Sequence, residues 1–282
     1  MNPTLHLCLA LLLPWVAAHA LAQEAMSLQR QDQTTIAVMA YVPMAGACRG
    51  VAVISPGAGG SETGYSYLGE ALAGLGYLAV VVGHPESGRS ALREQLRGNG
   101  LREGLAALIT EPDAYRGRFM DITSARQWAQ GRCQGTDTVL VGHSMGAATV
   151  LMEAGARNKL GLSGAQAFGA YIALSPQGAG SIFPANAWSD LQRPVLSITG
   201  TRDDELGGGS WQTRTEPYRD MPPGCKWLAV VDGATHMNLA GRGLARNTQA
   251  LTTQVIGDFL DGVHRGNCRA PRAHPGMTMA SK

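Results

Sequence analysis

The chain has 282 residues, enough for one large α/β domain, and its 45% apolar content is ordinary for a globular protein with a sizeable core. Its formal net charge of +2, with no run of like charges, gives no electrostatic reason to expect nucleic acid or an anionic membrane as a partner. One globular domain is the simplest interpretation.

The N-terminal residues have the composition of a secretory signal peptide. Half of residues 5–16 are leucine, and this apolar run is too short to span a bilayer, which takes about 20 apolar residues. Ala20-Leu21-Ala22 then offers a cleavage site with small residues. No Lys or Arg precedes the apolar run, so a buried N-terminal helix is the alternative. We predict a signal peptide over residues 1–22 and a secreted or periplasmic protein with no stable membrane insertion after cleavage.

Short apolar runs, each ended by Gly, Pro or Ser, alternate with segments of helical spacing. An antiparallel pair near 28–31 and 35–42 comes first. The later runs are 50–55, 77–82, 138–142, 170–174, 194–199 and 227–231, and the helical segments are 65–75, 122–129, 147–156 and 244–259. Most of these runs are continuous rather than alternating, as in strands buried on both faces of a parallel sheet. The alternation predicts a mostly parallel sheet with helices on both faces.

One domain is expected over residues 23–268. Residues 84–120 contain glycines and polar side chains, and we expect loops around a short helix there. The tail 269–282 has two prolines and no apolar periodicity, so we expect it to be disordered. The segment 175–193 is short, which predicts no large helical lid.

The strongest motif is Gly142-His143-Ser144-Met145-Gly146, which follows one apolar run and precedes a helix of small residues. This is Gly-x-Ser-x-Gly in a strand–turn–helix context, which lifts the serine hydroxyl above the sheet. The helix N-terminus favours negative charge developing there. Ser144 is therefore the candidate nucleophile, and a tight turn that merely uses these residues is the alternative.

A base and an acid should follow the serine in the chain. His236 lies just beyond the last apolar run, where a histidine can reach back and take the serine proton. A carboxylate that orients this histidine is expected after the run 194–199, where Asp203, Asp204 and Glu205 are the three candidates; we choose Asp203, with Asp204 second. His84 and His143 are assigned to local hydrogen bonding.

An oxyanion formed at the serine needs two backbone donors. The amide of Met145 is one candidate, and the glycine-rich loop 55–60 supplies the other, for which we favour Ala58. Such a loop can also bind phosphate, but the chain has neither Gly-Lys-Ser/Thr nor Gly-x-Gly-x-x-Gly. No nucleotide site is expected.

Apart from Cys8 in the leader, the chain has four cysteines: Cys48, Cys133, Cys225 and Cys268. An even number in an exported protein predicts two disulfides, with four reduced thiols as the alternative for an unexported chain. No Cys-x-x-Cys or His-x-x-x-His spacing occurs, so no metal site is expected.

Over residues 28–265 the chain resembles the α/β-hydrolase superfamily. The resemblance rests on the order of four motifs: the Ser-Pro-Gly loop, Gly-His-Ser-Met-Gly, Gly-Thr-Arg-Asp and Ala-Thr-His-Met. Within it, the chain is similar to the dienelactone-hydrolase-like and platelet-activating-factor-acetylhydrolase-like branch, and to bacterial cutinase-like polyester hydrolases. The resemblance implies an eight-stranded, mostly parallel sheet and no cofactor. It places Ser144, Asp203 and His236 on the triad positions, and Ala58 and Met145 on the oxyanion positions.

The chain also departs from these relatives. Dienelactone hydrolases carry cysteine in place of Ser144, and the polyester hydrolases usually carry an aromatic residue in place of Ala58. Trp188 falls on the segment where such enzymes line the acyl pocket; it is a candidate substrate wall, with a core or surface role as the alternative. The strand neighbours that the resemblance implies pair Cys48 with Cys133 and Cys225 with Cys268, on the edge of the sheet opposite the active site.

These residues predict a secreted serine hydrolase that cleaves a small-molecule or lipid-like carboxylic ester through an acyl-enzyme. Transfer of the acyl group to an alcohol or amine is the alternative on the same triad. A non-catalytic binding module on a hydrolase scaffold is the alternative of another class.

Overall fold

The structure is a computed structural model that describes residues 22–43, 48–205, 208–268 and 272–282. The predicted signal peptide, except for Ala22, and Cys8 lie outside the described residues. None of the helices in the described ranges is long and apolar enough to cross a membrane.

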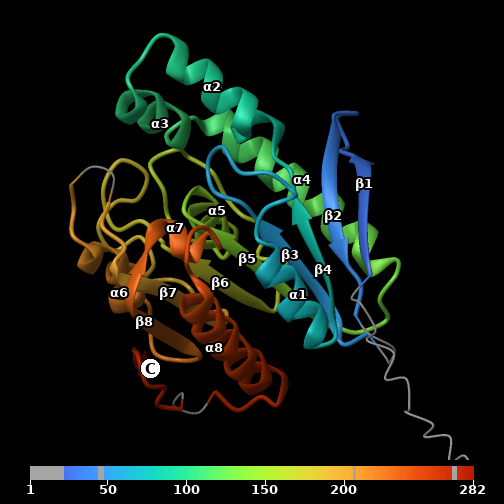
Figure 1. The fold of residues 1–282 in the computed structure, drawn as a ribbon, viewed down its shortest axis with the longest axis vertical. Coiled ribbons are helices and arrows are strands. Elements are labelled where there is room, and N and C mark those ends of the chain that lie inside the picture. Colours follow the sequence, from blue (N-terminus) through green and yellow to red (C-terminus); the bar gives the residue numbers. More distant parts are fainter. Residues whose placement is uncertain (1–21, 44–47, 206–207, 269–271) are drawn as a thin grey trace, which may run out of the picture.

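A single nine-stranded sheet forms the centre of the described part of the molecule (Figure 1), in the order β1-β2-β4-β3-β5-β6-β7-β8-β9. Its strands are β1 (Gln23–Gln29), β2 (Thr35–Tyr41), β3 (Gly50–Ser55), β4 (Tyr77–Val82), β5 (Asp137–His143), β6 (Ala170–Leu174), β7 (Val195–Arg202), β8 (Lys226–Thr235) and β9 (Met277–Ser281). The strands from β3 to β8 are parallel, and β1, β2 and β9 are antiparallel additions at the edges. The predicted mostly parallel sheet is confirmed, with one strand more than expected.

Helices cover both faces of this sheet (Figure 1). They are α1 (Ser66–Gly74), α2 (Arg89–Arg97), α3 (Leu101–Ile109), α4 (Pro112–Gln130), α5 (Met145–Glu153), α6 (Glu216–Asp220), α7 (His236–Leu239) and α8 (Arg246–His264), with short 3-10 turns η1 (Pro85–Ser87) and η2 (Trp211–Thr215). Val51 and Val53 of β3 pack in the core with α4 and α5, whereas Ala52 and Ile54 pack in the core with α1 and α8. Burial on both faces is the reason that β3 is apolar at every core position rather than at alternate ones.

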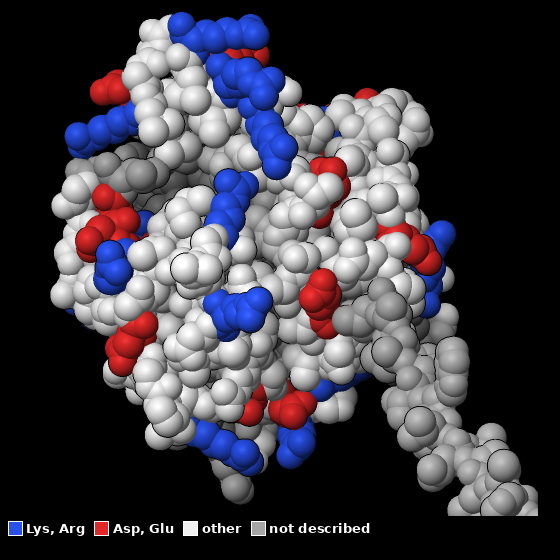
Figure 2. Space-filling model, in the orientation of Figure 1, with Lys and Arg blue, Asp and Glu red and all other residues white. Residues whose placement is uncertain are grey.

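The segment 84–120 is more helical than the sequence predicted. The helices α2 and α3 contact each other and form a hairpin above the carboxyl end of β4 (Figure 1). The Glu111-Pro112 pair starts α4 within this segment: Pro112 occupies its first turn, and the Glu111 side chain accepts from the Asp113 amide. Basic side chains gather along α2, at the top of the view in Figure 2.

No helix forms between residues 175 and 194, in agreement with the expectation of no large lid. The expected disorder of residues 269–282 is wrong for their last part, because Met277–Ser281 form β9. This strand pairs with β8 from Val231↔Met277 to Trp227↔Ser281. Its five residues are too few to show a periodicity in the sequence. The tail becomes a strand because it pairs with the edge of β8, which would otherwise leave a row of backbone donors and acceptors without partners.

Both predicted disulfides are present, with Cα–Cα separations of 5.5 Å for Cys48–Cys133 and 5.3 Å for Cys225–Cys268. The first follows from sheet register, because Gly50 at the start of β3 pairs with Asp137 at the start of β5. The second joins the start of β8 to the chain that leaves α8. Both bonds therefore lie at the amino-terminal edge of the parallel strands.

Replacing both cysteines of the Cys48–Cys133 pair by serine should lower the free energy of unfolding by about 2–4 kcal/mol, because the bond closes a long loop in the unfolded chain. Urea denaturation followed by circular dichroism measures this loss. The Cys225–Cys268 double variant gives the comparison with a shorter loop. An unchanged denaturation midpoint in both double variants would contradict a stabilising role.

Candidate active site

Ser144 stands in a strained turn between β5 and α5, with φ 56° and ψ −118°. Its two flanking glycines have no room for a side chain. A Cβ atom added at Gly142 would lie 2.3 Å from the carbonyl oxygen of Gly146, and one added at Gly146 would lie 2.0 Å from the carbonyl oxygen of Ser55. Helix and strands therefore meet at backbone distance, and the surrounding core holds the serine in a conformation that it would not adopt alone.

The glycine-rich loop after β3 lies directly against Ser144. A Cβ atom added at Gly57 would be 3.3 Å from the Ser144 Cβ. Residues 57–60 form a turn in which the Gly60 amide donates to the Gly57 carbonyl at 3.0 Å, and the φ of +71° at Gly59 is typical of a type II turn. The turn is therefore tight enough to bring its backbone amides to the serine.

Two amides beside Ser144 are free to bind a ligand. The Ala58 amide has no hydrogen-bond partner among the described residues. Met145 is the first residue of α5, so its amide has no acceptor within the helix. These are the two donors that the sequence proposed for an oxyanion.

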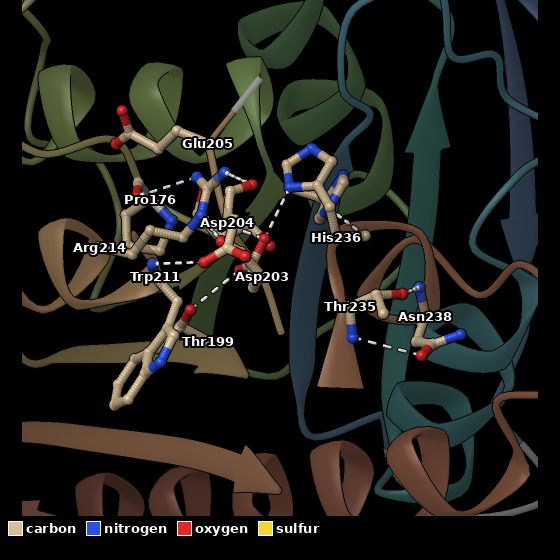
Figure 3. A network of polar contacts seen from close by, with 12 residues as sticks. Pro176, Thr199, Asp203, Asp204, Glu205, Trp211, Arg214, Thr235, His236 and Asn238 are labelled. Atoms are coloured by element: carbon tan, nitrogen blue, oxygen red, sulfur yellow. Dashed lines mark hydrogen bonds and ion pairs between the residues drawn. The ribbon is translucent and has the colours of Figure 1, made fainter. Parts of the chain in front are cut away.

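His236 is fixed by a capping box at the start of α7 (Figure 3). The Asn238 amide donates to the Thr235 hydroxyl, while the Thr235 amide donates to the Asn238 side chain. His236 Nδ1 lies 2.9 Å from Asp203 Oδ1, and the ring keeps 23% of its surface exposed. The carboxylate thus orients the ring and leaves Nε2 as the nitrogen available for chemistry.

Asp203, rather than Asp204, meets the histidine, because only Asp203 turns inward (Figure 3). Its side chain is fully buried, and its Oδ2 accepts from the Thr199 hydroxyl at 2.9 Å. The exposed Asp204 instead accepts from the Trp211 amide. The turn after β7 therefore divides two adjacent carboxylates between the interior and the solvent.

Arg214 compensates the buried charge of Asp203, and the sequence analysis missed it. Its Nε lies 3.1 Å from Asp203 Oδ1 and donates to the Asp203 carbonyl, while its Nη1 donates to the Ser175 carbonyl at 3.0 Å. A buried carboxylate without such a partner would pay a large desolvation cost. No local pattern marks Arg214 in the sequence, because an arginine in a polar loop looks the same whether it is buried or exposed.

His143 connects the 57–60 turn with His236. Its Nε2 lies 3.1 Å from the His236 carbonyl oxygen, which can only accept, so Nε2 carries the proton. Its Nδ1 then accepts from the Tyr65 hydroxyl at 2.9 Å, and that hydroxyl accepts from the Gly57 amide at 3.1 Å. Burial lowers the pKa of His143 well below its usual range, which keeps the ring in this neutral form.

Ser144 and His236 open into one cavity of about 340 Å³. Its apolar wall is formed by Leu105, Ala106 and Ile109 of α3 together with Ile182. The other lining residues are Arg102, Gln177, Gly178, Ala179, Gly180, Ser181, Glu205 and Arg214. Among the described residues, no cluster of three or more His, Cys, Asp or Glu side chains has the arrangement of a metal site.

Trp188 does not form a substrate wall. Its side chain is fully buried in the core and packs on Phe183 with a centroid distance of 5.2 Å. The segment before β7 turns this ring inward, away from the cavity. The apolar wall comes instead from α3, in the region where sequence patterns gave no clear structure.

No protein-family model matches the chain, and no curated protein matches its sequence. Solved structures do match. The esterase domain of a Rhodothermus marinus protein has a TM-score of 0.57 at 14% identity, covering 86% of this chain and 99% of its own. An α/β serine hydrolase without a lid from Xanthomonas campestris has a TM-score of 0.54 at 18% identity, covering 88% of this chain and 97% of its own.

A dienelactone hydrolase from Anabaena variabilis also matches, with a TM-score of 0.54 at 16% identity, covering 86% of this chain and 98% of its own. At these identities the likeness concerns the fold. The protein has an α/β-hydrolase fold, as its motifs predicted. Its place in the dienelactone-hydrolase-like branch stays a prediction, as does its similarity to the polyester hydrolases.

Replacing Asp203 by asparagine should reduce turnover of an ester substrate by about 10⁴-fold, because the amide no longer holds the required histidine tautomer. Replacing Asp204 by asparagine is the matched control, since this residue is adjacent and exposed, and turnover should stay within about twofold. Steady-state rates of both variants decide the assignment. The reverse ranking would move the acid to Asp204.

Proposed function

We propose that the protein is a secreted serine hydrolase that cleaves carboxylic esters through an acyl-enzyme on Ser144. The observation that carries this proposal is the ordered pair Asp203–His236 opening into the same cavity as a strained serine with two free amides beside it. Ser144, Asp203 and His236 follow one another in the chain order serine, aspartate, histidine, which is typical of α/β-hydrolases.

In this mechanism Ser144 Oγ attacks the ester carbonyl carbon while its proton passes to His236 Nε2. The carbonyl oxygen becomes an oxyanion and accepts from the amides of Ala58 and Met145, which are most useful when they point to where the charge develops. His236, now an imidazolium stabilised by Asp203, returns the proton to the alcohol that leaves. Water then attacks the acyl-enzyme by the same route, and its hydrogens end on the released acid and on Ser144.

The cavity favours esters with a small or flexible apolar group. The wall formed by Leu105, Ile109 and Ile182 offers apolar contact, and the volume of about 340 Å³ accommodates a modest chain rather than a rigid polymer. The esterase among the similar structures supports ester chemistry on this fold. Acyl transfer to an alcohol or amine would use the same residues and differs only in the acceptor.

Two disulfides in the described part of the chain support an oxidising compartment, because such bonds rarely persist in the cytosol. Together with the leucine-rich leader, they support export as part of the proposal. A non-catalytic binding module is the competing function, and the first experiment below distinguishes it.

Replacing Ser144 by alanine should abolish both covalent labelling by a fluorophosphonate and hydrolysis of p-nitrophenyl acetate. The rate should fall by several orders of magnitude while the circular dichroism spectrum is preserved. Ser181→Ala is the matched control, because this serine lines the same cavity, and it should label and turn over like the wild type. Absence of labelling and turnover in the wild type would favour a binding module.

Replacing Ile109 by tryptophan should shorten the acyl chain that the enzyme accepts, because the ring fills the α3 side of the cavity. We expect kcat/KM for p-nitrophenyl octanoate to fall about tenfold or more relative to the acetate ester. Ala107→Trp on the same helix is exposed and does not line the cavity, so it should leave this ratio unchanged. If the octanoate-to-acetate ratio of kcat/KM changed equally in both variants, the acyl chain would not bind against Ile109.

A further inference from the structure

A second Ser-His-Asp chain lies buried behind the 57–60 turn. His84 Nε2 is 2.9 Å from the hydroxyl of Ser55, and His84 Nδ1 is 2.8 Å from a carboxylate oxygen of Asp121. Ser55 has no exposed surface, so no substrate carbonyl reaches it in this structure. Burial lowers the pKa of His84 well below its usual range. Because Arg118 Nη1 can only donate to Ser55 Oγ, the Ser55 hydrogen is left for His84 Nε2, and the neutral ring carries its own proton on Nδ1 toward Asp121.

The lone pairs of Ser55 face Arg118, a fully buried arginine on α4. Arg118 Nη1 donates to Ser55 Oγ at 3.1 Å and to the Pro56 carbonyl at 2.7 Å, and its Nε donates to Ser87 Oγ at 2.9 Å. All three acceptors are neutral. Hydrogen bonds from a charged donor are stronger than those between neutral groups, and the planar guanidinium fixes their directions.

These contacts hold the first of three consecutive peptide groups beside Ser144. The Pro56–Gly57 peptide is held at both sides, because its carbonyl accepts from Arg118 and its N–H donates to the Tyr65 hydroxyl. The next peptide, Gly57–Ala58, is held at its carbonyl by the Gly60 amide.

The third peptide, Ala58–Gly59, is held at its N–H, which donates to the Ser87 carbonyl at 2.8 Å. Arg118 binds the hydroxyl of that same Ser87, so it holds the turn at its start directly and at its end through Ser87. The Ala58 N–H is the one amide between residues 57 and 60 that has no partner among the described residues.

We propose that Arg118, with Ser55, His84 and Ser87, is a positioning residue that aims the Ala58 amide at the oxyanion formed on Ser144. This inference rests on the proposed function of the Ser144 site. The second Ser-His-Asp chain serves as its support rather than as a second nucleophile: Asp121 orients His84, His84 orients the Ser55 hydroxyl, and the Ser55 lone pairs face Arg118.

Arg30 supplies the matched control. It is also buried and also binds Asp121, with Nη1 at 3.3 Å from Oδ1, and its Nη2 is 2.6 Å from Glu86 Oε1. Its guanidinium donates to Asp32, Asp121 and Glu86, and to none of the groups that Arg118 binds. Loss of either guanidinium disturbs the same buried network, but only loss of Arg118 removes the donors to the Pro56 carbonyl and the Ser87 hydroxyl, which hold the turn from outside.

The experiment compares Arg118→Met, Arg118→Lys and Arg30→Met with the wild type. Titration with a fluorophosphonate counts the active sites, and kcat and KM for p-nitrophenyl acetate are expressed per labelled site. The inhibition constant of a trifluoromethyl ketone reports binding of a tetrahedral oxyanion, since the serine hydroxyl adds to the unhydrated carbonyl carbon and the carbonyl oxygen becomes the oxyanion of a hemiketal. Thermal unfolding reports stability separately.

We expect Arg118→Met to lower kcat per site by about 10- to 100-fold, somewhat less than the loss of a direct oxyanion donor. KM should change less than threefold. The inhibition constant of the trifluoromethyl ketone should rise by the same factor by which kcat/KM falls. The kcat per site of Arg118→Lys should lie between those of the wild type and Arg118→Met, because one ammonium group can bond to the Pro56 carbonyl but cannot also reach Ser87. Arg30→Met should unfold at a lower temperature and keep kcat per site within twofold.

Equal losses of kcat per site in Arg118→Met and Arg30→Met would overturn the proposal, because they would indicate a merely structural role. So would an unchanged kcat per site in Arg118→Met. If that variant does not fold, Ser87→Ala takes its place, with a few-fold loss of kcat expected from the missing hydroxyl and no loss overturning the proposal. A wild type without labelling or turnover would overturn the proposed function as well, whereas an active wild type with unaffected variants would overturn the positioning role alone.

Discussion

The candidate site depends on the close approach of α5 to the end of β3. Gly146 lies so near the Ser55 carbonyl that a Cβ atom there would be 2.0 Å away, and Gly142 is equally confined against Gly146. This contact brings the serine turn and the 57–60 turn together, since each follows one of two neighbouring parallel strands. The strain at Ser144 is sustained because the packed core on both sides of the sheet determines where these backbones lie.

Two buried arginines support this arrangement. Arg214 holds the carboxylate and carbonyl of Asp203, and Arg118 holds the carbonyl of Pro56 and the hydroxyls of Ser55 and Ser87. In a medium of low dielectric constant such bonds are strong, but an unpaired partner is costly. Buried arginine therefore holds both Asp203 and the peptide that precedes the 57–60 turn, and His143 joins these two segments through Tyr65 and the His236 carbonyl.

Stability and chemistry are divided between the two edges of the sheet. Both disulfides lie where the parallel strands begin, and the candidate catalytic side chains lie where these strands end. Loops at the carboxyl edge of an open α/β sheet converge on one crevice, which is the usual place for a ligand. The α2–α3 hairpin is added at this edge, so the wall of the cavity can vary without altering the strands that position Ser144.

The sequence by itself determined the parallel sheet, the serine turn and the position of His236, because these follow from local patterns. Strands buried on both faces are apolar throughout, and Gly-x-Ser-x-Gly between a strand and a helix has few other uses. Tertiary structure decided between Asp203 and Asp204, placed β9 on the edge of β8, buried Trp188 in the core, lined the cavity with α3, and buried Arg118 and Arg214. Each of these depends on partners distant in sequence, and a charged or short apolar segment carries no local sign of whether such partners will enclose it.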